Sequence, residues 1–223
     1  MDADVVIVGS GIAGALVAER LAKAGVQVTI IEAGPRVDRG TAVVQYYNAL
    51  IKVPESPYPN TTYAPHPRSE NLDDYYVQTG PQKFSSTYLR QVGGTTWHWL
   101  GTCLRFVPDD FRLAARFGRG VDWPIGYDVL EPWYSDAENE IGVAGDSSDD
   151  LGSPRSRPYP MPVIPMSYLD QQVAKAFAGT PYEVRATPQG RNAIVRDDRP
   201  PCCGNNSCCS VCGTIIYYNN IIY

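Results

Sequence analysis

Residues 4–34 read DVVIVGSGIAGALVAERLAKAGVQVTIIEAG, and this stretch decides the fold. Residues 5–8 form a short apolar run, which predicts a strand buried on both faces. The run leads directly into the pattern G-x-G-x-x-G at residues 9–14. Residues 26–31 predict a second apolar strand, which ends at Glu32. This order predicts an α/β protein with a Rossmann-like βαβ unit.

The segment between the two strands is predicted to be a helix with one apolar face. That face consists of residues at helical spacing, namely Ile12, Leu16, Val17 and Leu21. Gly25 follows where a helix commonly stops, because glycine readily adopts the left-handed conformation there.

Each glycine of the turn has a predicted role in binding a dinucleotide. Gly9 permits the tight turn, Gly11 lets the backbone approach a pyrophosphate, and Gly14 lets helix and strand pack closely. The helix N-terminus offers unpaired N–H groups and a positive dipole to that pyrophosphate. Glu32, 18 residues after Gly14, is predicted to accept hydrogen bonds from a ribose and to disfavour NADP by charge. The candidate binding residues of this segment are Gly9, Ser10, Gly11, Ile12, Ala13, Gly14, Glu32 and Ala33.

Composition and charge exclude several classes of protein. The 223 residues are 43% hydrophobic and 19% charged, as in an ordinary globular protein of one large or two small domains. A net charge of −5 without a basic stripe argues against nucleic-acid binding. The first four residues include two aspartates and no basic residue, so we expect no signal peptide, and the uncharged apolar run at 5–18 is too short for a membrane span.

Two further stretches, at 55–76 and 83–106, are informative. Residues 55–76 (ESPYPNTTYAPHPRSENLDDYY) predict a long surface excursion after a helical region around 41–53, either a lid over a cofactor or an irregular solvent-facing loop. Residues 83–106 (KFSSTYLRQVGGTTWHWLGTCLRF) contain a glycine pair, two threonines and a histidine between two tryptophans. Glycine pairs allow close approach of the backbone to a ligand, so we interpret this second stretch as a cofactor contact.

The six cysteines are distributed unevenly. Cys103 stands alone, and the other five lie between Cys202 and Cys212. A secreted disulfide framework would spread them out, so the clustering indicates a metal or cluster site. Spacing leaves two alternatives open, an iron–sulfur cluster and a zinc site that uses four of these five thiolates.

Local signals predict three more helices. Asp109 and Asp110 fit the start of a short helix, Asp128 with Glu131 has the spacing of a capping box, and Ser167 with Asp170 predicts a helix as far as Phe177. The residues predicted for the buried face of the second helix are Leu130, Tyr134, Ala137 and Ile141. Trp123 is assigned a packing role. The Gly, Ser, Asp and Pro content of residues 144–165 predicts a linker or surface crossing rather than core.

Three of these motifs together resemble the N-terminal half of glucose–methanol–choline (GMC) oxidoreductases. They are GSGIAG at 9–14 with Glu32, RQVGGTTWHW at 90–99 and DWPI at 122–125. Within that superfamily the chain resembles the flavin-bearing large subunits of bacterial FAD-dependent glucose, gluconate, fructose and sorbitol dehydrogenases. The resemblance covers nearly the whole chain to about Cys212.

The resemblance implies cofactors and partners. FAD is expected to contact Arg90, Gly93, Gly94, Thr95, Thr96 and His98. In some relatives a histidine bonds covalently to the flavin, and the resemblance leaves open whether His98 does so. Cys202, Cys208 and Cys212 match the ligands of a three-iron, four-sulfur cluster. A sugar or alcohol would be the substrate, with electrons passing to a cytochrome c subunit. A small escort subunit would carry the protein to the periplasmic side of the membrane.

The resemblance also implies an organisation in three parts. Residues 1–143 would form the FAD-binding part, 144–200 a linker and the start of the cap or substrate region, and 201–223 the cysteine loop and a tail that departs from the family pattern after 212. The family's catalytic histidine is expected beyond residue 223, so we interpret the chain as a fragment without its C-terminal substrate domain and without a catalytic base. Two alternatives are a GMC oxidase that uses oxygen and a non-catalytic FAD-binding or electron-transfer remnant. A nicotinamide-dependent dehydrogenase would have no role for residues 93–99.

Overall fold

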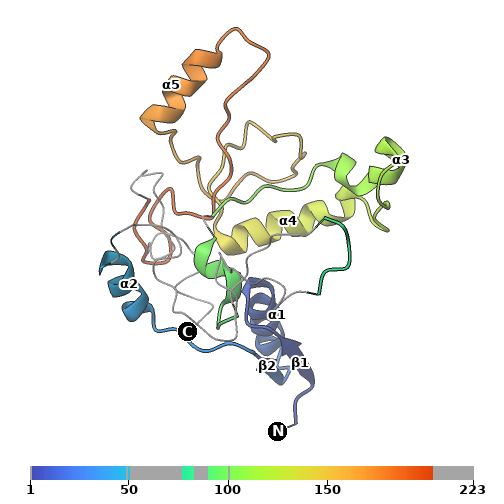
Figure 1. Ribbon diagram of the computed structural model, residues 1–223, viewed down its shortest axis with the longest axis vertical. Coiled ribbons are helices and arrows are strands. Elements are labelled where there is room, and N and C mark those ends of the chain that lie inside the picture. Colours follow the sequence, from blue (N-terminus) through green and yellow to red (C-terminus); the bar gives the residue numbers. More distant parts are fainter. Residues whose placement is uncertain (1, 49, 51–76, 83–89, 100, 203–223) are drawn as a thin grey trace. The chain divides into compact units, whose positions relative to one another are not determined.

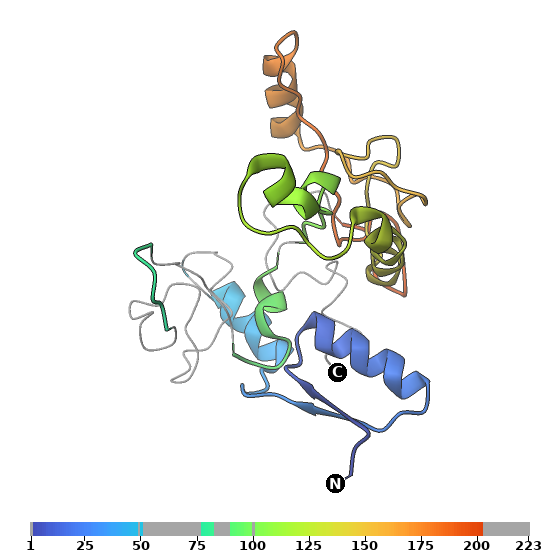
Figure 2. The same ribbon diagram turned by 90° about the vertical axis from the view of Figure 1, so that its right-hand side faces the viewer.

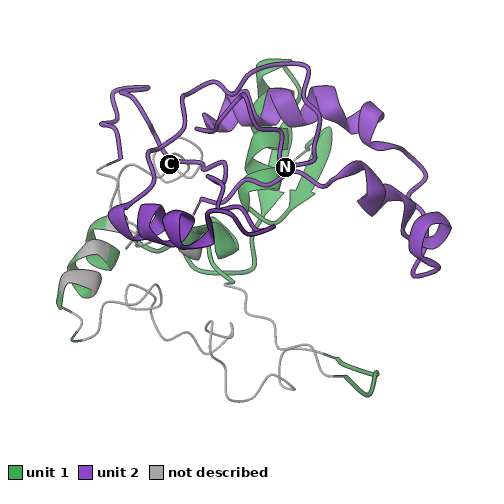
Figure 3. Ribbon diagram, turned by 90° about the horizontal axis from the view of Figure 1, so that it is seen from above, with its two compact units in different colours: residues 1–100, 209–212, 217–223 green, residues 101–208, 213–216 purple. Residues whose placement is uncertain are grey.

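The computed structural model describes residues 2–48, 50, 77–82, 90–99 and 101–202, which fall into two compact units. Unit 1 contains the described residues up to 99, and unit 2 contains those from 101 to 202 (Figure 3). The predicted lid at 55–76 and the cysteines after Cys202 lie outside the described residues. The proposed boundaries at 143 and 200 stay predictions.

Unit 1 is built on the predicted βαβ unit, which confirms the α/β fold class. Strand β1 (Val5–Val8) is followed by helix α1 (Ile12–Lys23) and strand β2 (Val28–Ile31). The strands pair in parallel, with Val5 opposite Val28, and α1 lies along them (Figures 1 and 2). β2 begins two residues later than predicted, because the N–H of Val26 donates to the carbonyl oxygen of Leu21 at the end of α1.

The prediction that β1 is buried on both faces is wrong. Val6 is 54% exposed and Val8 is 84% exposed. Among the described residues β1 pairs only with β2. Ile7 points toward α1, since a Cβ built on Gly14 would lie 3.2 Å from its Cγ2. Successive side chains of a strand point to opposite faces, so Val6 and Val8 are left on the uncovered face.

The ends of the unit 1 helices follow from local chemistry. Gly25 adopts a φ of +82° just after α1, as expected of the residue that stops the helix. Of the predicted apolar face, only Val17 is half exposed, at 50%. Helix α2 (Arg39–Asn48) begins two residues before the expected Thr41, and an oxygen of Asp38 accepts hydrogen bonds from the N–H and hydroxyl of Thr41, both at 2.8 Å.

Unit 2 contains four described helices. They are η3 (Pro108–Arg112), α3 (Leu113–Phe117), α4 (Tyr127–Ile141) and α5 (Tyr168–Phe177). The helix predicted to begin at Ser167 and Asp170 is confirmed, and the structure adds a capping box in which the N–H of Asp170 donates to the hydroxyl of Ser167. The packing role of Trp123 is also confirmed, because its ring lies 5.3 Å from that of the buried Phe111.

Two predictions about α4 are wrong. Its N-cap is Gly126 rather than Asp128, because Tyr127 already belongs to the helix. The buried residues of α4 are Tyr127, Ser135 and Glu138 rather than the predicted apolar set. A buried cation explains this polar face, since Glu131, Ser135 and Glu138 of α4 accept hydrogen bonds from Arg105.

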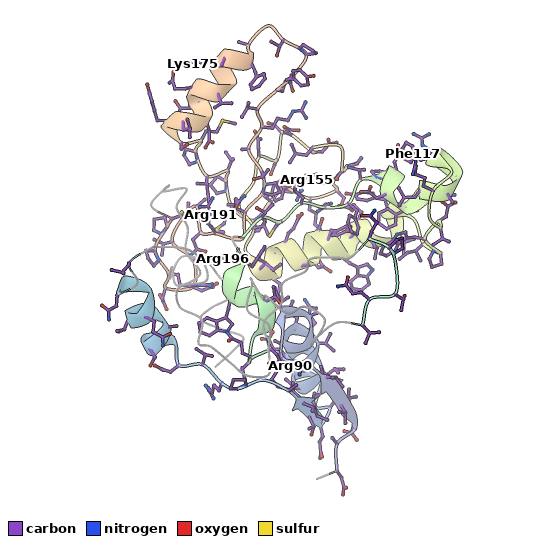
Figure 4. The ribbon with its side chains drawn as sticks, viewed as in Figure 1. Arg90, Phe117, Arg155, Lys175, Arg191 and Arg196 are labelled. Carbon is purple, nitrogen blue, oxygen red and sulfur yellow. The ribbon has the colours of Figure 1, made fainter. Side chains whose placement is uncertain are left out.

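Arg105 is the centre of a buried charge network in unit 2. Its side chain is 3% exposed, and its Nε and Nη2 donate to the two carboxylate oxygens of Glu138 at 2.7 and 2.8 Å. Its Nη1 donates to Glu131 at 3.1 Å, and its Nη2 donates to Ser135 at 2.9 Å. Arg155, labelled in Figure 4, forms a second ion pair with Glu138. Glu131 therefore binds this guanidinium instead of capping α4.

The 144–165 stretch contributes to the interior of unit 2, contrary to expectation. Ala144 and Met161 are 1% and 2% exposed and form a small apolar cluster. Ala144 exchanges two backbone hydrogen bonds of 2.8 Å with Gln189, a partner that composition does not reveal. Within the described part of the chain, no helix combines the length and apolarity needed to cross a membrane.

Candidate functional site

The glycine-rich turn of unit 1 has the geometry that its sequence predicts. Gly9 has a φ of +92°, and its N–H donates to the carbonyl oxygen of Ile31 at 2.7 Å. A Cβ built on Gly14 would lie 2.2 Å from the carbonyl oxygen of Gly9, so only glycine lets α1 pack here. A Cβ on Gly11, the N-cap of α1, would meet no atom within 4 Å. Open space therefore lies in front of the helix N-terminus.

Glu32 lies beside this turn and is held by backbone and side-chain donors. The N–H and hydroxyl of Ser10 donate to its Oε2 at 2.9 and 2.6 Å, and the N–H of Gly34 donates to its Oε1 at 2.8 Å. Burial raises the pKa of Glu32, but these hydrogen bonds outweigh burial and hold the pKa below its usual value. Glu32 is therefore a carboxylate at neutral pH. Its contact with a ribose stays a prediction.

The glycine pair at 93–94 packs against the same turn. Gly93 is buried with a φ of +88°, and Gly94 has a φ of +56°. The N–H of Gly93 donates to the hydroxyl of Ser10 at 3.2 Å. The structure thus brings together two motifs that are 83 residues apart in the chain.

A second contact attaches this segment to the end of β2. A Cβ built on Gly34 would lie 2.0 Å from the carbonyl oxygen of Arg90, so the two backbones approach as closely as glycine allows. The N–H of Val92 donates to the carbonyl oxygen of Pro35 at 3.0 Å. Sequence reasoning did not identify the roles of Gly34 and Pro35, although a glycine just after Glu32 was a usable signal.

The residues after the glycine pair form the 3-10 helix η2 (Gly94–His98). Trp97 is 2% exposed, and its indole N–H donates to the carbonyl oxygen of Val92 at 2.8 Å. Thr96 is 8% exposed and Thr95 is exposed. The imidazole of His98 lies outside the described part of the chain, so its contact with a flavin stays a prediction. Of the other candidates, Ile12 is half-buried, whereas Ala13, Ala33 and Arg90 are exposed.

Of the predicted cluster ligands, the structure describes only Cys202. The N–H of Cys202 donates to the carbonyl oxygen of Asn192 at 2.7 Å. The guanidinium of Arg191, labelled in Figure 4, lies 3.7 Å from its sulfur and donates to it. The described residues contain no group of three or more potential metal ligands, and Cys208 and Cys212 lie outside them.

The thiol of Cys103 is held in its protonated form. Burial, with a smaller contribution from the charge of Glu138, raises the pKa of its thiol to about 12. Its Sγ donates to the carbonyl oxygen of Gly101 at 3.4 Å. Because the thiolate is the reactive form, Cys103 is a structural cysteine at neutral pH.

The residues of unit 1 fit a bound dinucleotide. The open space at Gly11 faces the N–H groups that begin α1, where an anion is favoured. Glu32 and Gly93 both contact the glycine-rich turn at residues 9–14, through the hydroxyl of Ser10.

Comparison with known proteins agrees with this geometry. A family model described as an NAD(P)-binding Rossmann-like domain matches residues 7–41. The fructose dehydrogenase large subunit of Gluconobacter japonicus is 36% identical over 99% of this chain and 42% of that protein. The 2-methyl-1,2-propanediol dehydrogenase of Mycolicibacterium austroafricanum is 33% identical over 64% of this chain and 25% of that protein. A GMC-type oxidoreductase of Mycobacterium tuberculosis is 31% identical over 94% of this chain and 27% of that protein.

The fold and the glycine-rich turn define a Rossmann-like protein. The chain belongs to the GMC-type oxidoreductases, of which it corresponds to the N-terminal part. It spans less than half the length of the relatives named above, at 42%, 25% and 27%.

Proposed function

We propose that this chain is the FAD-binding part of a dehydrogenase that oxidises the CH–OH group of a sugar, sugar acid or sugar alcohol. The main observation behind the proposal is that the hydroxyl of Ser10, in the turn that begins at Gly9, hydrogen-bonds both Glu32 and the backbone N–H of Gly93. The similarity to fructose dehydrogenase over 99% of the chain supports the substrate class. When bound, FAD supplies the hydride acceptor of the reaction.

The residues of unit 1 have distinct roles in this proposal. The N–H groups at the start of α1 would bind the pyrophosphate, and the missing side chain of Gly11 would leave room for it. Glu32 is ionised and accepts hydrogen bonds from the ribose. The turn at Gly93 and Gly94, with Thr95 and Thr96, would hold the flavin. His98 is the candidate for a covalent bond to the flavin, and a base from elsewhere in the complete protein removes the hydroxyl proton.

The cysteine loop provides the route for electrons in this proposal. Cys202, Cys208 and Cys212 would each hold one iron of a three-iron, four-sulfur cluster, which would supply one-electron transfer toward a cytochrome c subunit. The hydrogen bond from Arg191 to the sulfur of Cys202 places a cation beside the first of these positions. A small escort subunit would carry the protein to the periplasmic side of the membrane, as the family resemblance suggests.

Anaerobic reduction of the flavin tests the proposed reaction. The protein expressed from its complete gene is mixed with D-fructose, D-gluconate, D-sorbitol or 1,2-propanediol, and the bleaching of the flavin absorbance is followed. We expect at least one of these compounds to reduce the flavin within seconds to minutes. No reduction by any of them would contradict the proposed substrate class.

Iron content distinguishes the dehydrogenase from an oxygen-using oxidase. We expect about three irons per chain, an EPR signal from the oxidised cluster, and loss of both in Cys202→Ser. Protein with full flavin, no iron and rapid peroxide formation would be an oxidase. Four thiolates with bound zinc would contradict the cluster, and flavin that no donor reduces would indicate a non-catalytic remnant.

A further inference from the structure

The hydroxyl of Ser10 lies between two elements that are distant in sequence. It is 2.6 Å from Oε2 of Glu32 and 3.2 Å from the backbone nitrogen of Gly93. An ionised carboxylate only accepts hydrogen bonds, and a backbone N–H only donates. The single hydroxyl proton of Ser10 is therefore committed to Glu32, and a lone pair of the same oxygen accepts the proton of Gly93.

Both ends of this bridge are sensitive to its loss. Gly93 is buried, so its N–H would lose a hydrogen-bond partner without gaining free access to water. At the other end Glu32 would keep the N–H of Ser10 and the N–H of Gly34 but lose its shortest hydrogen bond.

The turn at Gly93 has a shape that needs external support. Two successive glycines adopt positive φ values of +88° and +56°. Because glycine has no side chain, the backbone at these two positions is flexible unless other contacts hold it. Within the turn the N–H of Gly94 donates to the carbonyl oxygen of Gln91 at 2.8 Å. Val92 is attached to Pro35, which lies after β2. Ser10 adds a contact on the side of the glycine-rich turn, at the N-terminal end of α1.

We propose that Ser10 is a positioning residue whose hydroxyl joins the Gly9–Gly14 turn and Glu32 to the turn at Gly93, so that they present one surface to the dinucleotide. The proposal rests on the proposed function for the identity of the ligand, FAD, whereas the bridge itself is a property of the ligand-free chain. Alanine at position 10 removes the bridge. Threonine keeps a hydroxyl and restores it.

Hydrogen exchange tests the bridge. Peptides that cover residues 90–98 are compared in the flavin-free protein from its complete gene, for wild type, Ser10→Ala, Ser10→Thr and the exposed control Ser148→Ala. We expect exchange in this peptide to be about tenfold faster in Ser10→Ala and unchanged in the other two variants. Equal exchange in wild type and Ser10→Ala would overturn the proposal. Ser10→Cys, with its weak S–H donor, answers the same question if the alanine variant does not fold.

FAD affinity tests what the bridge does. We expect the Kd for FAD to rise about tenfold or more in Ser10→Ala and to recover in Ser10→Thr. Faster exchange with an unchanged Kd would overturn the role in binding. A wild-type protein that binds no FAD would contradict the proposed function instead, and the exchange result would still decide whether the bridge exists.

Discussion

The carbonyl oxygen of Gly9 lies where a side chain of Gly14 would begin: a Cβ built on Gly14 is 2.2 Å from it. This contact fixes how closely α1 approaches β1. By contrast, a Cβ on Gly11 meets no protein atom within 4 Å. Packing therefore requires glycine at position 14 but not at position 11, where the proposed reason for glycine is the ligand.

Alanine at these two positions separates folding from binding. Gly14→Ala should lower the free energy of unfolding by about 1–3 kcal/mol, because the backbone oxygen must move. Gly11→Ala should cost less than about 1 kcal/mol, since its φ of −67° suits alanine, yet it should weaken FAD binding at least about tenfold. Urea unfolding and flavin titration measure the two effects. Equal stability of the two variants would contradict this division.

Gly34 should be as intolerant of a side chain as Gly14. A Cβ there would lie 2.0 Å from the carbonyl oxygen of Arg90, so Gly34→Ala should displace the 90–98 segment and cost about 1–3 kcal/mol. Gly80 is the matched control, because a Cβ on it meets nothing within 4 Å, and Gly80→Ala should stay within about 0.5 kcal/mol of wild type. Thermal unfolding compares the two. A neutral Gly34→Ala would rule out the close approach.

The buried pair of Arg105 and Glu138 should contribute far more to stability than an exposed pair. Glu138→Gln leaves Arg105 with a buried and poorly compensated charge, and we expect a loss of about 3–5 kcal/mol. The control Asp136→Asn breaks the ion pair between Asp136 and Arg157, whose side chains are 44% and 49% exposed respectively. This substitution should cost less than about 1 kcal/mol. Urea denaturation measures both, and similar losses would argue against the network.

The same network predicts a dependence of stability on pH. Burial raises the pKa of Glu131, but hydrogen bonds from Ser156, Arg105 and Ser135 outweigh burial and hold the pKa at about 2. A pKa that is lower in the folded state means that the ionised carboxylate stabilises the fold above the usual value of 4.5, and that this contribution is lost as the pH falls toward 2. The stability difference between wild type and Glu131→Gln should therefore shrink between about pH 5 and pH 2. A difference that stays constant in urea unfolding over this range would contradict the assignment.

Local patterns made much of the fold predictable. The βαβ unit follows from the apolar runs around residues 9–14, and the start of α5 follows from Ser167 and Asp170. Both signals lie within a few neighbouring residues. The residues of the candidate site were likewise named from two short motifs, although their contacts with each other were not.

The parts that sequence reasoning missed depend on contacts between distant residues. Arg105 binds Glu138 across 33 positions, and Ser10 binds Gly93 across 83. Nothing local in the chain marks Ser10 and Gly93 as partners. One signal was present in α4, where Glu131, Ser135 and Glu138 share a helical face at spacings of four and three. Polar residues there indicate a buried cation better than the apolar face that was predicted.

Flavin content tests the central claim most directly. The protein from its complete gene is purified, denatured or digested to release its cofactor, and the cofactor is identified by mass spectrometry and absorbance. We predict about one FAD per chain, recovered as free FAD or as a peptide containing His98, and a clear loss in Gly11→Val with cooperative unfolding retained. A wild-type protein that neither contains FAD nor binds it on titration would contradict the account.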